Sequence, residues 1–128
     1  MKYYTNKVLD GNFDDVIEKV TNALKEQGFG VLTEIDVTST FKKKLDVDFR
    51  NYRILGACNP PNAHKALTAE PYIGLMLPCN VVVQENEDGK IDVSAVDPKA
   101  SMAAVENKEL EEGAEHIKGQ LEIVIDKL

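Results

Sequence analysis

The spacing of apolar residues predicts one long amphipathic helix near each end of the chain. Over residues 13–27 and 108–127 the apolar positions recur with a period of roughly 3.6 residues, and charged side chains take the other face. The first stripe contains Phe13, Val16, Ile17, Val20 and Leu24. The second contains Leu110, Ala114, Ile117, Leu121, Val124 and Leu128. Each helix therefore has one apolar face that must cover another layer of structure.

Five other segments have the composition of β-strands, with β-branched and aromatic residues at many positions. They are residues 2–9, 29–37, 52–57, 75–84 (most clearly from 80) and 91–96. In the second segment, strict alternation predicts one face for Val31, Thr33 and Ile35 and the other for Leu32 and Glu34. The last two segments are expected to form a hairpin, because Asp88-Gly89 lies between them.

Capping residues and prolines predict three shorter helices. Asn12 should cap the first long helix and Gly28 should end it, while Ser39 should cap a short helix that ends near residue 46. Pro60-Pro61 favours a second short helix, which Pro71 stops. A third should follow Asp97-Pro98 and end near residue 105.

These elements predict a single domain over residues 1–128 with an α+β fold. We expect two layers, in which a mostly antiparallel sheet of about five strands is covered on one face by two long helices. The other sheet face would carry Tyr3, Tyr4, Leu32 and Ile54, which is more apolar surface than a solvated face needs. We therefore expect a homodimer, with two-fold symmetry as the commonest closed arrangement.

Composition narrows the classes of partner. The chain of 128 residues has a formal net charge of -7 and a pI near 4.8, which disfavours nucleic acid as a partner. It has no apolar run near the roughly 20 residues that span a bilayer, and its first residues lack the features of a signal peptide. We expect a cytoplasmic protein that binds neither nucleic acid nor membrane.

Two sequence blocks resemble one known family. "YRILGACNPPNAHKAL" and "IGLMLPCNVVVQE", followed by a hairpin and "VDPKASM", are similar to the domain-of-unknown-function 302 family over nearly the whole chain. The resemblance implies a two-layer α+β fold comparable to the TATA-binding-protein-like topology, and a dimer. It implies no particular activity.

The two cysteines occupy matching contexts, because Cys58 and Cys79 are each followed by asparagine and lie close to proline. If the strand that ends at Ala57 pairs with the one that begins near Pro78, the two thiols are expected to lie close together. Three interpretations stay open: two buried packing residues, a redox or sulfur-handling pair, and a soft-metal site. Cys58 also precedes a helix start, where a thiolate is stabilised.

The candidate binding residues surround this cysteine pair. They are Cys58, Asn59, His64, Glu70, Cys79 and Asn80. Cys58 and Cys79 are the metal-ligand candidates, with His64 as a further one, although structural zinc normally needs four such ligands. Asn59 and Asn80 are expected to bond turn backbones. His116, on the last helix, is expected to be solvated.

The sequence favours a non-enzymatic binding or accessory module whose ligand is a small molecule, a sulfur species or a soft metal. One alternative is a thiol-dependent redox or sulfur-transfer enzyme, with Cys58 as nucleophile and Cys79 as resolving thiol. The other is a structural or interaction protein with buried cysteines. No nucleotide-binding, metalloprotease or nucleophile-elbow motif is present, so the residues establish neither a cofactor nor a catalytic group.

Overall fold

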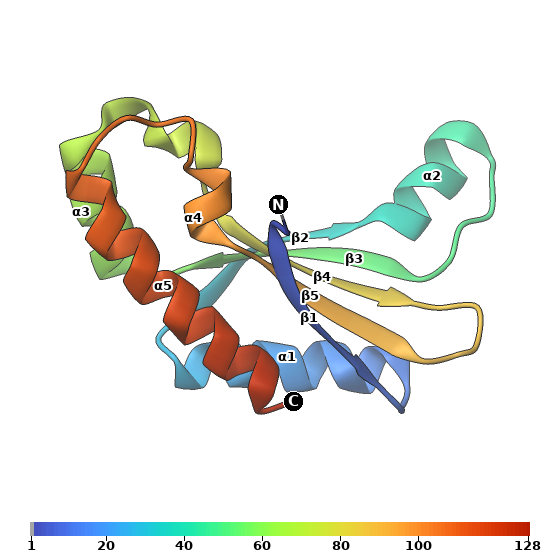
Figure 1. Cartoon of the computed structure of the whole chain (residues 1–128). Coiled ribbons are helices and arrows are strands. Elements are labelled where there is room, and N and C mark those ends of the chain that lie inside the picture. The colour runs from blue at the N-terminus through green and yellow to red at the C-terminus, as the bar shows by residue number, and fades with distance from the viewer. Residues whose placement is uncertain (1) are drawn as a thin grey trace.

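Five antiparallel strands form one sheet in the order β1-β5-β4-β3-β2 (Figure 1). The computed structural model describes residues 2–128. The strands are β1 (Tyr4–Leu9), β2 (Gly30–Asp36), β3 (Tyr52–Cys58), β4 (Cys79–Glu85) and β5 (Ile91–Val96). The helices are α1 (Phe13–Glu26), α2 (Val37–Leu45), α3 (Pro60–Ala69), the 3-10 helix η1 (Pro71–Met76), α4 (Pro98–Ser101) and α5 (Glu109–Asp126).

The long helices α1 and α5 cover one face of the sheet, and the core lies between the two layers (Figure 1). The largest fully buried side chains of this core come from both layers. They are Leu24, Leu55, Ile91, Leu121, Val20, Val81, Val83, Val93 and Val124. The five residues of the predicted stripe that lie on α5 are buried, and so is Leu128 after the helix. The predicted α+β class, the antiparallel sheet and its two covering helices are thus confirmed.

Local signals explain where α1 begins and ends. The side-chain oxygen of Asn12 accepts hydrogen bonds from the backbone N–H groups of Asp14 at 3.0 Å and Asp15 at 3.3 Å, as expected of an N-cap. After the helix, Gly28 has a φ of 84°, which is a left-handed conformation that glycine adopts without strain. The chain then enters β2 at Gly30.

A β-bulge in β2 contradicts the predicted strict alternation of this strand. Val31 pairs with Ala57 and Thr33 with Gly56, so two steps along β2 oppose one step along β3. The extra residue is Leu32, whose exposed fraction is 68%. As a result Val31 lies on the face that the long helices cover. Thr33 and Ile35 lie on the other face, although strict alternation would place them on the same face as Val31.

Three boundaries also differ from the sequence-based expectation. The N-cap of α2 is Asp36, not Ser39, because the Asp36 carboxylate accepts a hydrogen bond from the backbone N–H of Ser39 at 2.9 Å. Pro71 does stop α3, but residues 71–76 then form η1 instead of the start of a strand. The helix after Asp97 ends at Ser101, well before residue 105.

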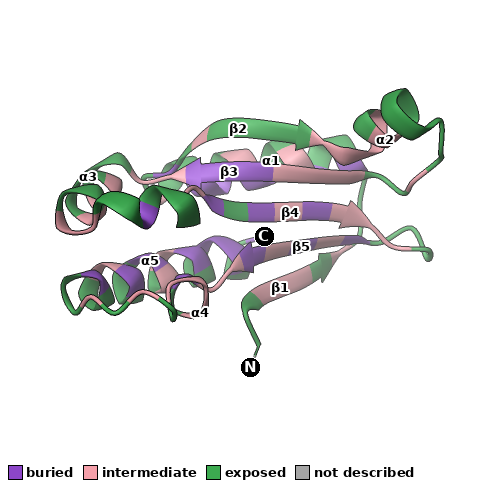
Figure 2. Cartoon of the chain, turned by 90° about the horizontal axis from the view of Figure 1, so that it is seen from above, coloured by how far each residue is buried: buried purple, intermediate pink, exposed green. Residues whose placement is uncertain are grey.

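The second sheet face is left uncovered by α1 and α5 (Figure 2). Ile35, Ile54 and Val82 lie side by side across β2, β3 and β4 on this face. The exposed fraction of Ile35 is 49%, and that of Val8 on β1 is 47%. Tyr4 and Ile54 therefore lie on the open face as expected, whereas Leu32 lies in the bulge and Tyr3 precedes β1. Within residues 2–128, no helix has the length and apolar character needed to cross a membrane.

Candidate functional site

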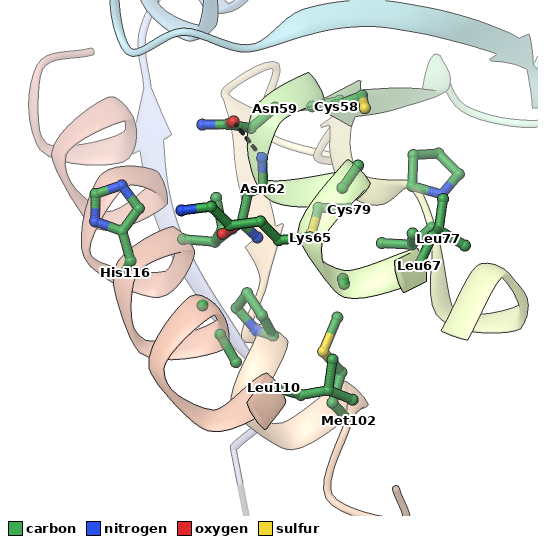
Figure 3. A pocket seen from close by; sticks show the side chains of 18 of the residues that line it. Cys58, Asn59, Asn62, Lys65, Leu67, Leu77, Cys79, Met102, Leu110 and His116 are labelled. Carbon is green, nitrogen blue, oxygen red and sulfur yellow. Dashed lines mark hydrogen bonds between the residues drawn. The ribbon is translucent and has the colours of Figure 1, made fainter. Parts of the chain in front are cut away.

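A cavity of about 680 Å³ lies at the end of the sheet where β3 ends and β4 begins. Figures 1 and 3 show α3, η1, α4 and the first turns of α5 gathered beyond these strand ends. The apolar lining consists of Phe29, Leu32, Ala57, Ala63, Ala66, Leu67, Leu77, Pro78, Pro98, Met102, Leu110, Ala114 and Ile117. The walls are therefore built by segments far apart in the sequence.

The wall formed by α3 is held against α5 by two asparagines. Asn59 caps α3, since its side-chain oxygen accepts a hydrogen bond from the backbone N–H of Asn62 at 3.2 Å. The side-chain nitrogen of Asn59 donates to Gln120 on α5 at 3.3 Å. Asn62 itself lies over Gly113, where a β-carbon would be 3.1 Å from the Asn62 amide oxygen. The absence of a side chain at Gly113 thus lets the two helices approach closely.

A close approach of backbone and side chains shapes the sheet end of the cavity. Gly56 on β3 is buried, and Thr33 and Pro78, which both line the cavity, pack over it. A β-carbon at Gly56 would lie 2.7 Å from Cγ of Pro78 and would clash even more closely with the Thr33 hydroxyl. Only glycine fits at this position.

The two cysteines both line the cavity, but the prediction that their thiols meet is wrong. The strands do pair as expected, with Ala57 directly opposite Cys79. Cys58 is one residue further along, and successive side chains of a strand point to opposite faces. Cys79 is therefore buried on the helix-covered face, whereas Cys58 belongs to the other face and is half-buried (Figure 3). Both thiols are free.

Burial gives Cys79 the chemistry of a neutral thiol. Desolvation is the main cause that raises its pKa from 9.0 to about 11, and the charge that Cys58 would carry as a thiolate adds to the shift. At neutral pH Cys79 is protonated, so it is a poor nucleophile and a poor metal ligand. Among residues 2–128, no three His, Cys, Asp or Glu side chains gather where they could hold a metal ion.

Of the other predicted site residues, one lines the cavity and three do not. Asn59 lines the cavity and bonds a helix backbone, as expected. His64 is exposed and lies outside the cavity lining, and so does Glu70, whose carboxylate accepts a hydrogen bond from Asn107 at 3.4 Å. Asn80 is exposed on β4, opposite Gly56, and does not line the cavity either.

The cavity is also lined by polar residues that the sequence did not indicate as site residues, and we call this set the polar rim. It consists of Asn62, Lys65, Glu109, Glu112 and His116, which all line the cavity, and all except the half-buried Asn62 are exposed. A helical spacing links these residues, because 62 and 65 are three apart on α3 and 109, 112 and 116 share one face of α5. That spacing was visible in the sequence, but nothing in it showed that the two helix faces meet.

Comparisons with known proteins agree on the family. The model of the family described as domain of unknown function DUF302 matches residues 4–128. A crystal structure of an uncharacterized conserved DUF302 protein from Bacillus stearothermophilus is similar, with a TM-score of 0.91 and 27% identity over 99% of this chain and 98% of that one. A search of curated proteins found no match. Because the family model covers nearly the whole chain, the protein belongs to the DUF302 family.

Proposed function

We propose that this protein binds a small, mainly apolar molecule in the cavity between α3 and α5, and that it acts as a binding or accessory module. The observation that carries the proposal is the cavity itself. Its volume of about 680 Å³ falls within the range of roughly 300–1,000 Å³ that is typical of small-molecule sites. Such sites combine apolar walls with a few polar groups that orient the ligand, as the polar rim does here.

The placement of the thiols favours binding over disulfide chemistry. A thiol-disulfide cycle within the chain needs the sulfurs of Cys58 and Cys79 to meet, and they belong to opposite faces of the sheet. Cys58 alone is half-buried in the cavity lining, where it can contact a ligand. Two unbridged cysteines also suit the reducing cytoplasm, which we propose as the location of the protein.

A neutral solvatochromic dye such as Nile red, followed by displacement with 1-dodecanol, tests the proposal. Binding to the cavity should raise and blue-shift the dye fluorescence, because the dye leaves water for an apolar environment. Ala66→Phe places a large ring in the cavity from the lining face of α3 and should weaken dye binding at least tenfold. Thr68→Phe is the matched control, since Thr68 is exposed on the same helix and does not line the cavity.

Two results would count against the binding module. One is a folded wild-type protein that neither takes up the dye nor responds to dodecanol. The other is equal loss of binding in Ala66→Phe and Thr68→Phe, which would place the dye on the surface of α3 instead of in the cavity. Circular dichroism of both variants shows whether they retain the fold.

We also propose that the protein forms a homodimer through the uncovered face of the sheet. The row of Ile35, Ile54 and Val82 crosses three strands of that face. Val8 is a separate apolar side chain of the same face, because Asp92 of β5 pairs with it and Ser94 of β5 pairs with Val82. Ile35 remains 49% exposed in a single chain, and its burial by a second copy would stabilise the pair. A two-fold arrangement would bring the same row of each copy together.

A further inference from the structure

We propose that the cavity ligand is an amphiphile with a hydrocarbon part and a carboxylate, and that Lys65 binds the carboxylate at the polar rim. This inference rests on the proposed small-molecule binding and names the chemical class of the ligand. The cavity lining has two parts that match the two parts of such a ligand. Apolar side chains from α4 and α5 form the interior, and polar residues lie at the rim.

Lys65 is the cation available to such a ligand. It lines the cavity, and in the described chain (residues 2–128) no carboxylate lies within 4 Å of its ammonium group. Two other lysines near α5 do have such partners: Lys99 contacts Glu115 at 2.8 Å and Lys118 contacts Asp97 at 3.3 Å. The charge of Lys65 is therefore left for a group that the described chain does not supply.

Asn62 adds a neutral donor beside that charge. Figure 3 shows Lys65 extending from α3 alongside Asn62, on the side that faces α5. The side-chain amide of Asn62 makes no hydrogen bond within residues 2–128, whereas its backbone N–H is bonded to Asn59. An ammonium and an amide N–H together suit the two oxygens of a carboxylate, which accepts several hydrogen bonds. His116, across on α5, lines the same rim.

Two carboxylates of the rim weaken the binding of an anion and so limit the expected preference for a carboxylate ligand. Glu109 and Glu112 line the cavity from α5 and repel an anion. Both are exposed, so solvent screens their charge, and the same screening keeps the Lys65 contribution modest. We therefore expect a preference of about fivefold for a carboxylate over a neutral head group, which is the upper end for an exposed ion pair.

The test compares three ligands of equal chain length, each below its micelle concentration, as competitors of the neutral dye. Dodecanoate should displace the dye about fivefold more effectively than 1-dodecanol, and dodecyltrimethylammonium should be the weakest. Lys65→Gln should abolish the preference for dodecanoate over dodecanol. Lys44→Gln is the control, because it removes the same charge from an exposed position on α2, away from the cavity. Glu112→Gln should increase the preference for dodecanoate.

The outcomes separate this inference from the proposed function. If dodecanol and dodecanoate bind equally in the wild type, or if Lys65→Gln keeps the difference, the carboxylate assignment is overturned while the apolar cavity stands. Tighter binding of the cationic ligand would overturn it as well and assign the rim to Glu109 and Glu112. If neither the dye nor dodecanol binds, the proposed function fails and this inference fails with it.

Discussion

Cys58 and Cys79 lie on neighbouring strands, and their side chains belong to opposite faces of the sheet, because Ala57 and not Cys58 is the residue opposite Cys79. The two cysteines therefore lie in different environments, although each is followed by asparagine in the sequence. Cys79 belongs to the core, while Cys58 stands at the start of the segment that caps α3. This difference leads to the first two predictions.

The two thiols should differ strongly in reactivity. With a pKa of about 11, Cys79 has about 100-fold less thiolate at neutral pH than a thiol that keeps the value of 9.0, and it is buried as well. Iodoacetamide should modify Cys58 first, as measured by peptide mass spectrometry over time, and dodecanol should slow that modification. Mild oxidant should yield no bond between the two sulfurs in the folded chain. Equal rates at both cysteines, or a 58–79 disulfide, would contradict this geometry.

Alkaline pH should destabilise the fold through Cys79. The unfolded thiol ionises near pH 9, whereas the folded one stays protonated up to about pH 11. Above pH 9 the unfolded chain binds fewer protons, so the free energy of unfolding falls by up to roughly 1.4 kcal/mol per pH unit across this window. Urea unfolding of the wild type at about pH 7 and about pH 10.5 should show the loss.

Variants identify the group responsible for this pH dependence. Cys79→Ala should be less stable at neutral pH, because it removes buried atoms, but it should lose less additional stability at alkaline pH than the wild type. Cys58→Ala should keep the full alkaline loss. If Cys79→Ala and the wild type show the same slope, other titrating groups cause it.

Gly56 should tolerate no side chain. In Gly56→Ala the new β-carbon collides with Thr33 and Pro78, so we expect a loss of about 1–3 kcal/mol in the free energy of unfolding and weaker dye binding. Gly30→Ala is the matched control on the neighbouring strand, because nothing lies within 4 Å of a β-carbon there. Chemical denaturation of both variants checks the difference, and equal stabilities would show that β3 adjusts to the added atom.

Asn59 and Asn80 should respond differently to the same substitution. Asn59→Ala removes the cap of α3 and the hydrogen bond to Gln120, and should lower the free energy of unfolding by about 1 kcal/mol. Asn80→Ala changes an exposed strand position and should stay within about 0.5 kcal/mol of the wild type. Thermal and urea unfolding compare the two. A larger effect of Asn80→Ala would mean that its side chain contacts something outside the single chain, such as a dimer partner.

The proposed dimer should depend on Ile35. Ile35→Lys puts a charge into the apolar row of the open face, and in a two-fold interface the change occurs twice. Analytical ultracentrifugation should show a dimer for the wild type and a monomer for Ile35→Lys. Ile123→Lys is the control, since Ile123 has an exposed fraction of 43% on α5, away from that face. A wild type that remains monomeric at high concentration would reject the homodimer.

The elements that sequence reasoning predicted well are those with a strong local signal. The stripes of α1 and α5, the cap at Asn12 and the Asp88-Gly89 hairpin depend on residues within one turn or one loop of each other. The bulge at Leu32 reverses the faces of β2, and a shift of one residue in register decides which face a side chain joins. Neither effect has a local signature in the sequence. The register of β3 against β4 is the reason why the thiols of Cys58 and Cys79 do not meet as predicted.

The cavity was harder to foresee than the fold, because it arises where α3 meets α4 and α5. No residue of α3 is buried, so its sequence does not mark which side faces inward. The sequence indicates His64 as a candidate site residue and not its neighbour Lys65, although of the two only Lys65 lines the cavity. Successive residues of a helix point about 100° apart around its axis, so Lys65 can line the cavity while His64 faces solvent.

The bulge in β2 has a consequence for how the protein behaves at high concentration. β2 is an edge strand, and a straight edge offers a row of unpaired backbone groups to any other extended chain. At Leu32 the extra residue interrupts the even spacing that such a chain would need for continuous pairing. The bulge thereby makes this edge a poorer template for another chain, so deletion of Leu32 should favour aggregation even if the deletion variant still folds.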